Sequence, residues 1–92
     1  MLRRIALGGM KLNTQEGPGL LVDHVGMFAP HDFARRAGFV KGDVILDFDG
    51  YEPKREADLI AYSLRKKKAG DRVPVTVLRG GAERTLTLTI PD

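Results

Sequence analysis

The residues of this chain that are able to do chemistry are few and are not grouped. His24 and His31 have no nucleophile or third ligand nearby, so structural roles suit them better than catalysis or metal binding. Ser63 lies in a helical run that does not resemble the turn around a serine nucleophile. Asp47 and Asp49 flank Phe48 at the end of an expected strand, and the pair Asp49-Gly50 is typical of a turn rather than of paired-carboxylate catalysis. We therefore expect no catalytic site, no metal and no cofactor.

Two other motifs have the composition of binding segments. The pair Gly8-Gly9 between apolar residues is, taken alone, equally compatible with a β-bulge or a turn. The run Arg65-Lys66-Lys67-Lys68 suits the end of a helix, where cations are favoured by the helix dipole; contact with nucleic acid or anionic lipid is the alternative. The two tyrosines and four phenylalanines are scattered and offer no stacking platform. With a net charge of only +3, no nucleic-acid partner is expected.

Length and composition indicate one globular domain over residues 1–92. Hydrophobic residues make up 42% and charged residues 29% of the chain, and disordered chains have lower hydrophobic content. There is no cysteine, so the redox compartment stays open. No apolar stretch approaches the roughly 20 residues of a membrane span, and no signal core follows the basic start. We expect no membrane insertion, and we expect the chain to be a piece of a longer protein.

The hydrophobic pattern predicts about five strands, one short helix and one long helix. Asp32 is a candidate N-cap for the short helix and Gly38 a candidate stop, while Gly70 would end the long helix. Asp49-Gly50 and Gly80-Gly81 have the composition of two-residue turns. These elements predict a mainly β fold, a small partly open barrel or sandwich capped by the two helices. The expected strands cover residues 5–12, 19–25, 44–48, 72–79 and 83–90, and the expected helices cover 33–37 and 56–68.

Two ordered blocks of the sequence resemble a PDZ domain of the bacterial kind that is attached to HtrA-type proteases. Residues 34–50 have a short helix ending in Ala37-Gly38, then Gly42-Asp43 and a strand that ends in a glycine turn. Residues 58–81 have a second helix, Gly70-Asp71, and a strand that ends at Gly80-Gly81. The order of elements is similar to the circularly permuted bacterial arrangement, in which the last strand corresponds to the first strand of animal relatives.

The resemblance implies a non-catalytic module that binds an extended peptide as an added strand beside the long helix. The terminal carboxylate would be held by the backbone N–H groups of Leu7-Gly8-Gly9-Met10, where glycine leaves room for an anion. Gly8 stands where the family pattern has a hydrophobic residue. Arg3 would assist the carboxylate. The other residues expected along the groove are Lys11, Leu12, Ala57, Ala61 and Leu64, of which Leu64 would close the pocket for the terminal side chain.

Three further expectations follow from the resemblance. The partners would be protein C-termini or extended apolar peptides, and the domain would regulate or select substrates for a larger protein, possibly a protease. The alternative is a structural or assembly domain that docks proteins without recognising a terminal carboxylate. An extracytoplasmic bacterial location is expected from the family type alone, and the oligomeric state stays open.

Overall fold

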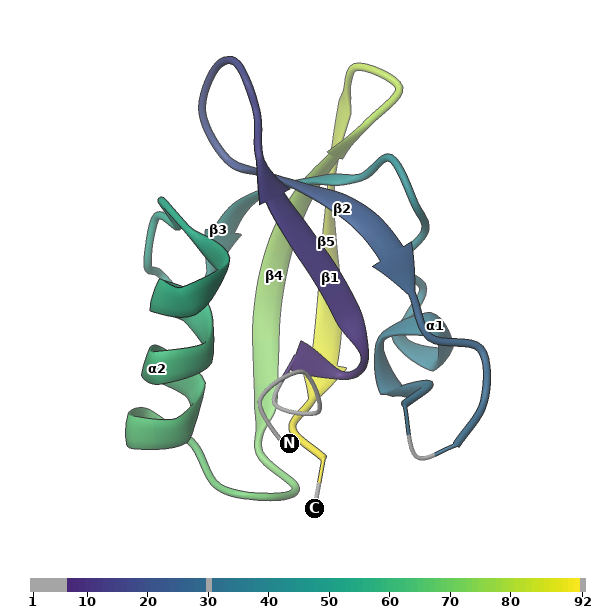
Figure 1. The fold of residues 1–92 in the computed structure, drawn as a ribbon, viewed down its shortest axis with the longest axis vertical. Coiled ribbons are helices and arrows are strands. Elements are labelled where there is room, and N and C mark those ends of the chain that lie inside the picture. Colours follow the sequence, from purple (N-terminus) through teal and green to yellow (C-terminus); the bar gives the residue numbers. More distant parts are fainter. Residues whose placement is uncertain (1–6, 30, 92) are drawn as a thin grey trace.

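The computed structural model describes residues 7–29 and 31–91, and its architecture is mainly β with two helices, as predicted (Figure 1). All strand pairings are antiparallel, and the strand order is β1-β2-β3-β4-β5, so β1 and β5 are the edges of the sheet. The elements are β1 (Met10–Thr14), β2 (Leu20–Val25), α1 (Phe33–Ala37), β3 (Val44–Phe48), α2 (Glu56–Lys66), β4 (Arg72–Arg79) and β5 (Ala82–Thr89).

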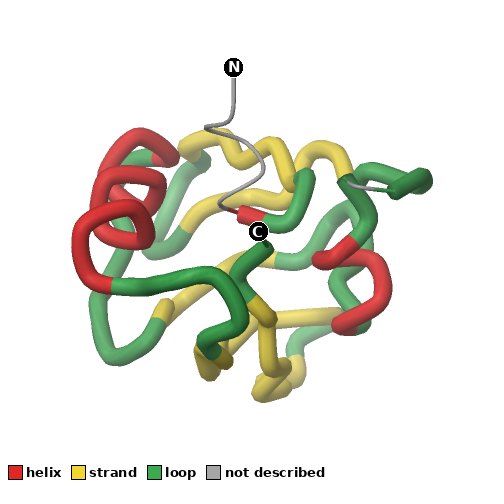
Figure 2. Tube along the Cα trace, turned by 90° about the horizontal axis from the view of Figure 1, so that it is seen from below, coloured by secondary structure: helices red, strands yellow, loops and turns green. Residues whose placement is uncertain are grey.

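The two helices lie at opposite flanks of the curled sheet (Figure 2). α1 contacts β5, and α2 contacts β1. Between them lies one apolar core, to which β4 contributes Val73, Val75 and Val77, the three valines whose alternation predicted a single buried face. Neither helix in the described ranges is long and apolar enough to cross a membrane.

Two tight turns lie where the sequence predicts them, one at the end of β3 and one between β4 and β5. Asp49 and Gly50 both have positive φ, 56° and 84°, and Phe48 and Tyr51 on either side exchange backbone hydrogen bonds. Gly80 and Gly81 also have positive φ and connect β4 to β5. Two successive left-handed residues match the twist of antiparallel strands, which explains why Asp-Gly and Gly-Gly occur at these positions.

Several predicted boundaries are corrected by the structure. The first strand begins at Met10 rather than at residue 5, because Leu7 to Gly9 form a turn; residues 5 and 6 lie outside the described ranges. α2 ends at Lys66, well before Gly70, because Lys67 is extended at ψ 155° and its N–H closes the helix on the Ser63 carbonyl. The last strand lies one residue earlier than expected.

The ends of α1 agree with the prediction only in part. Gly38 ends the helix in the left-handed conformation at φ 104°, as expected, and its N–H donates to the Arg35 carbonyl. Asp32 is at the N-cap position, but its side chain makes no capping hydrogen bond. Its carboxylate instead pairs with Arg36 one turn later, at 3.4 Å.

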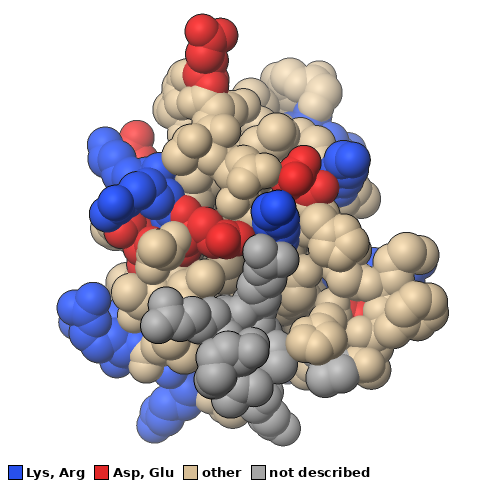
Figure 3. Space-filling view, viewed as in Figure 1, with Lys and Arg blue, Asp and Glu red and all other residues tan. Residues whose placement is uncertain are grey.

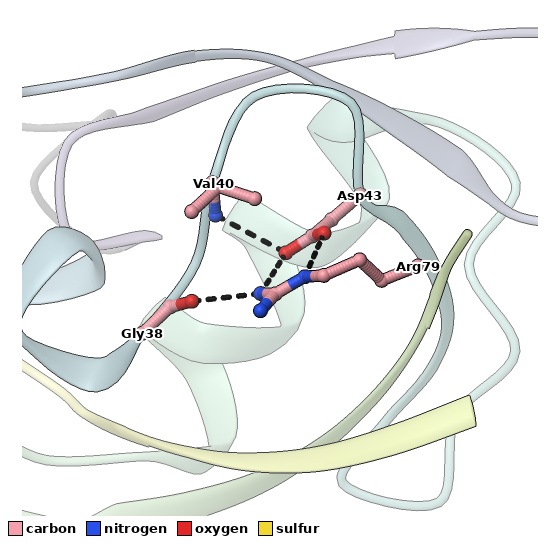
Figure 4. A network of polar contacts seen from close by, with 4 residues as sticks. All are labelled: Gly38, Val40, Asp43 and Arg79. Atoms are coloured by element: carbon pink, nitrogen blue, oxygen red, sulfur yellow. Dashed lines mark hydrogen bonds and ion pairs between the residues drawn. The ribbon is translucent and has the colours of Figure 1, made fainter. Parts of the chain in front are cut away.

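A buried ion pair fastens the loop between α1 and β3 to β4 (Figure 4). The Asp43 carboxylate is fully buried and accepts hydrogen bonds from Arg79 Nε at 2.7 Å and Arg79 Nη2 at 2.8 Å. The Val40 N–H donates to the same carboxylate at 3.1 Å, and Arg79 Nη2 also donates to the Gly38 carbonyl at 2.8 Å. These contacts raise the pKa of Arg79, chiefly through the hydrogen bond to Asp43. Asp43 and Arg79 are 36 residues apart in the sequence, so the network holds the loop between α1 and β3 against the end of β4.

Candidate functional site

The edge strand β1 lies beside α2 and has no strand partner on its outer side within the described ranges. Its inner side pairs with β2, Leu12 with Val22 and Thr14 with Leu20. On the outer side, the Leu12 N–H donates to the Glu56 carboxylate at 2.7 Å. An edge strand with outward backbone groups is a template for another strand, and α2 forms one wall beside it.

The turn before β1 is held by its carbonyl groups. The Gly8 carbonyl accepts a hydrogen bond from the Ala34 N–H at 3.0 Å, and the Gly9 carbonyl accepts one from the Gly26 N–H at 3.2 Å. In a trans peptide unit the N–H points opposite to the carbonyl, so the N–H groups of Gly9 and Met10 point away from these partners. Both glycines have positive φ, 69° and 89°. Two neighbouring N–H groups that are not directed at Ala34 or Gly26 are suited to an anion.

Close packing explains why this turn contains two glycines. A Cβ atom on Gly8 would lie 2.7 Å from the Ala34 backbone nitrogen, and one on Gly9 would lie 2.1 Å from the His31 carbonyl oxygen. Both separations are too short for any side chain, whatever its type. The turn is therefore pressed against the segment that leads into α1, and both glycines are buried.

The apolar side chains around this turn belong to the core. Leu7, Met10 and Leu12 are buried, and all three are members of the main core cluster. Lys11, between them on β1, is half-buried. The residues predicted for the carboxylate loop thus form one continuous segment at the start of the edge strand. Arg3, which was expected to assist a carboxylate, lies outside the described residues.

The structure divides the helical stripe that the spacing predicts for α2. Of Ala57, Ile60, Ala61, Leu64 and Lys68, only Ile60 is buried, and Leu64 is 62% exposed. The buried residues of the helix are Leu59, Ile60 and Ser63. Counting at helical spacing, Ile60 and Ser63 follow Glu56 on one face, and the bond from Glu56 to Leu12 turns this face toward β1.

Ala61 lies on a different side of α2 from β1. It lines a shallow hollow with Tyr51, Asp58 and Tyr62. Whether Ala57, Ala61 and Leu64 contact a peptide stays a prediction. Glu56 was missed because a charged residue at the start of a helix normally indicates a solvated first turn.

A polar cluster holds the far side of α2 to the turn after β3. Asp49 accepts a hydrogen bond from the Tyr62 hydroxyl at 2.8 Å and pairs with the Lys67 ammonium at 2.6 Å. The hydrogen bond from Lys67, and then that from Tyr62, lowers the pKa of Asp49, while the bond to Asp49 raises the pKa of Tyr62 and of Lys67. The Tyr62 ring stacks on Tyr51, with centroids 5.6 Å apart. These contacts hold α2 against the turn after β3.

Charge is unevenly distributed around this side of the molecule. Basic side chains gather over the C-terminal half of α2, at the lower left of Figure 3. Arg65 and Lys66 are in the last turn of the helix, where cations suit the helix dipole. Across the described ranges, no three His, Asp or Glu side chains are grouped as a metal site requires. The geometry thus offers a backbone edge and a helix wall, which are the components of a binding surface.

A family model described as a PDZ domain matches residues 9–90. This chain belongs to the PDZ domain family. The resemblance noted from the two sequence blocks is therefore confirmed over almost the whole chain. A PDZ domain is a non-catalytic, peptide-binding module, and this family membership explains why the catalytic side chains of an enzyme are not assembled around β1 and α2.

Similar proteins include proteases of the HtrA type. The chain is 33% identical over 72 residues to a probable periplasmic serine endoprotease DegP-like of Marinomonas sp. (strain MWYL1), covering 78% of the chain and 14% of that protein. It is 33% identical over 76 residues to the serine protease Do-like HtrB of Bacillus subtilis (strain 168), covering 83% of the chain and 16% of that protein. The PDZ domain thus spans about one-seventh of the length of these relatives.

A similar solved structure is that of the HtrA-type protease AlgW with tripeptide. Its TM-score is 0.74 at 26% identity, and the match covers 90% of this chain and 30% of that chain. That structure, of a protein that contains a tripeptide, thus shares the fold of this chain over most of its length.

Proposed function

We propose that this PDZ domain captures the extended C-terminal segment of another protein, which adds to β1 as a further strand beside α2. The observation that carries this proposal is the outward N–H of Leu12 on an edge strand, facing α2 across the space where a strand would lie. Main-chain hydrogen bonds to β1 would supply affinity, and side chains along α2 would supply selectivity.

The terminal carboxylate is proposed to bind at the Gly8-Gly9 turn. The N–H groups of Gly9 and Met10 point away from Ala34 and Gly26, which bond to the carbonyls of the same peptide units, and this supports the placement. The turn precedes β1, so a peptide with its C-terminus there runs antiparallel to β1. The apolar residues Met10 and Leu12 would lie beneath the last peptide residues, and Lys11 and Arg3 would attract the negative end. Ala57, Ala61 and Leu64 would contact the peptide only at the outer rim.

The experiment compares peptides that differ only at the terminus. Peptides of about eight residues with an apolar free-acid end and the same peptides as C-terminal amides are titrated by fluorescence anisotropy. We expect the amides to bind at least tenfold more weakly, because they lose a charge-assisted contact with backbone N–H groups. Amide chemical-shift changes should include Gly8, Gly9 and Leu12. Equal affinity of acid and amide would remove the carboxylate site from the proposal.

The wider context is also proposed rather than established. Because the relatives are six to seven times longer, we infer that the PDZ domain is one module of a longer HtrA-type protease. It would select substrates or restrain the active site until a peptide docks. An extracytoplasmic location follows if the parent resembles the periplasmic relative. Protease assays of the parent protein, with and without the best peptide, would test the regulatory role.

A second candidate function, assembly without carboxylate recognition, is favoured by one exposed surface. In the loop after β2, Met27 is 58% exposed and Phe28 80%, and Met27 lines a hollow together with Val40. Apolar surface of this kind is common at protein contacts. A partner that shifts the amides of this loop and leaves Leu12 unchanged would favour assembly over peptide capture.

A further inference from the structure

The side chain of Glu56 accepts a hydrogen bond from the Leu12 N–H, at the place where an added strand would bond to β1. The Leu12 N–H points outward from an edge strand, where it would bond to water or to an added strand. Instead, it donates to Glu56 Oε2 at 2.7 Å, across 44 residues of sequence. The carboxylate therefore occupies the acceptor position that a peptide carbonyl would take.

We propose that Glu56 is a latch that competes with the peptide for β1. In the free domain its carboxylate holds the Leu12 N–H, and a strand that pairs with β1 must displace it. This inference rests on the proposed function, because it concerns the same edge. It makes binding selective for segments that pair with β1 in an extended conformation, since only these place a backbone carbonyl opposite Leu12.

The position of Glu56 lets the latch open without moving the backbone. Glu56 is the first residue of α2 and is half-buried, so its side chain has access to solvent. A released carboxylate stays near the N-terminus of the helix, where negative charge is favourable. Displacement exchanges a hydrogen bond to a charged acceptor for one to a neutral carbonyl, which is weaker. The latch therefore lowers peptide affinity without abolishing binding.

Asp58 provides a matched control within the same helical turn. It also has a negative charge, and α2 has no other acidic residue in its first turn. Its carboxylate contacts only the guanidinium of Arg55, at 3.3 Å and near the surface, among the contacts of the described residues. Asp58→Asn thus removes a first-turn charge and leaves the edge of β1 unchanged.

The test uses Glu56→Ala, Glu56→Gln and Asp58→Asn in the same chain, with a free-acid apolar peptide as the probe. Glu56→Ala should speed hydrogen exchange of the Leu12 amide in the free domain by about tenfold. It should also bind the peptide on the order of fivefold more tightly, the effect of one modest hydrogen bond. Glu56→Gln should be intermediate, because an amide oxygen still accepts but is neutral. Asp58→Asn should match the wild type.

The outcomes separate the latch from the proposed function. Unchanged or weaker peptide binding by Glu56→Ala relative to Asp58→Asn overturns the latch, while a wild type that binds the peptide keeps the proposed function. A wild type and variants that bind no peptide refute the proposed function. In that case, unchanged Leu12 exchange in Glu56→Ala overturns the latch as well. If Glu56→Ala fails to fold, Glu56→Gln, which keeps the shape of the side chain, decides the question.

Discussion

Two carboxylates of this PDZ domain each accept a hydrogen bond from a backbone N–H, one in the loop between α1 and β3 and one beside the edge strand β1. Asp43 is fully buried and is bonded to Arg79 and to the Val40 N–H. Glu56 is half-buried and holds the Leu12 N–H. The Asp43 carboxylate is thus not accessible to solvent, whereas the Glu56 side chain is partly accessible.

The difference teaches which contacts are structural and which are exchangeable. Removing a partner from a buried ion pair leaves an uncompensated charge, so the Asp43 network must stay complete. A half-exposed side chain that occupies one edge donor has water as an alternative partner, and so has the donor. The Asp43 carboxylate therefore holds the loop before β3 in place, whereas the Glu56 carboxylate can be displaced from β1 by an added strand.

The largest expected effect is the loss of stability when the Asp43 network is broken. Asp43→Ala should destabilise the domain by about 3 kcal/mol, because Arg79 and the Val40 N–H lose their common acceptor. Urea unfolding measures this. Asp47→Ala is the control, since Asp47 accepts one exposed bond from Gly50 and should cost far less. Similar losses for the two variants would contradict the structural role of the Asp43 network.

A smaller loss of stability is expected from a change in the turn before the edge strand β1. Gly9→Ala should cost about 2 kcal/mol, because the new Cβ meets the His31 carbonyl oxygen and the residue is strained at φ 89°. The affinity of Gly9→Ala for the peptide should be lower than that of the wild type as well. Gly81→Ala has the same type of strain at φ 83° but open space around it, so it isolates the clash. If both variants unfold at the same urea concentration, close packing at Gly9 is not what requires glycine.

The smallest effect concerns the cluster that positions α2, and it depends on pH. Lys67 and Tyr62 lower the pKa of Asp49 in the folded domain below its ordinary value of 3.8. The folded state then binds fewer protons than the unfolded state, so this stability is present at neutral pH and is lost as pH falls below about 4 and through the folded pKa.

Thermal unfolding of the wild type and Asp49→Asn checks this sign. At pH 7 the variant should melt a few degrees lower. The difference should shrink as the pH falls below about 4 and through the folded pKa, because the wild-type carboxylate becomes protonated. A difference that persists or grows in acid would contradict the assigned pKa direction. Tyr62→Phe, which removes one of the two partners, should show a smaller version of the same behaviour.

The sequence by itself determined most of the local structure and the family. Strands β2, β3 and β4 and helix α1 were predicted to within a residue, because alternation, Asp-Gly and Gly-Gly turns and a helix-ending glycine act over a few neighbours. The two blocks around Gly42-Asp43 and Gly80-Gly81 identified the PDZ domain for the same reason: each block is local. The binding role of Leu7 to Leu12 came from the family resemblance and stays a prediction.

Only the tertiary structure decided which face of α2 looks at β1. A helix with alanines, Leu59, Ile60 and Leu64 has more than one plausible apolar stripe, and only Ile60 of the stripe that periodicity favoured is buried. The orientation is set by contacts between distant residues, Tyr62 and Lys67 with Asp49 on one side and Glu56 with Leu12 on the other. Sequence spacing cannot encode partners 44 residues apart, so Glu56 became visible as part of the site only when β1 and α2 were placed side by side.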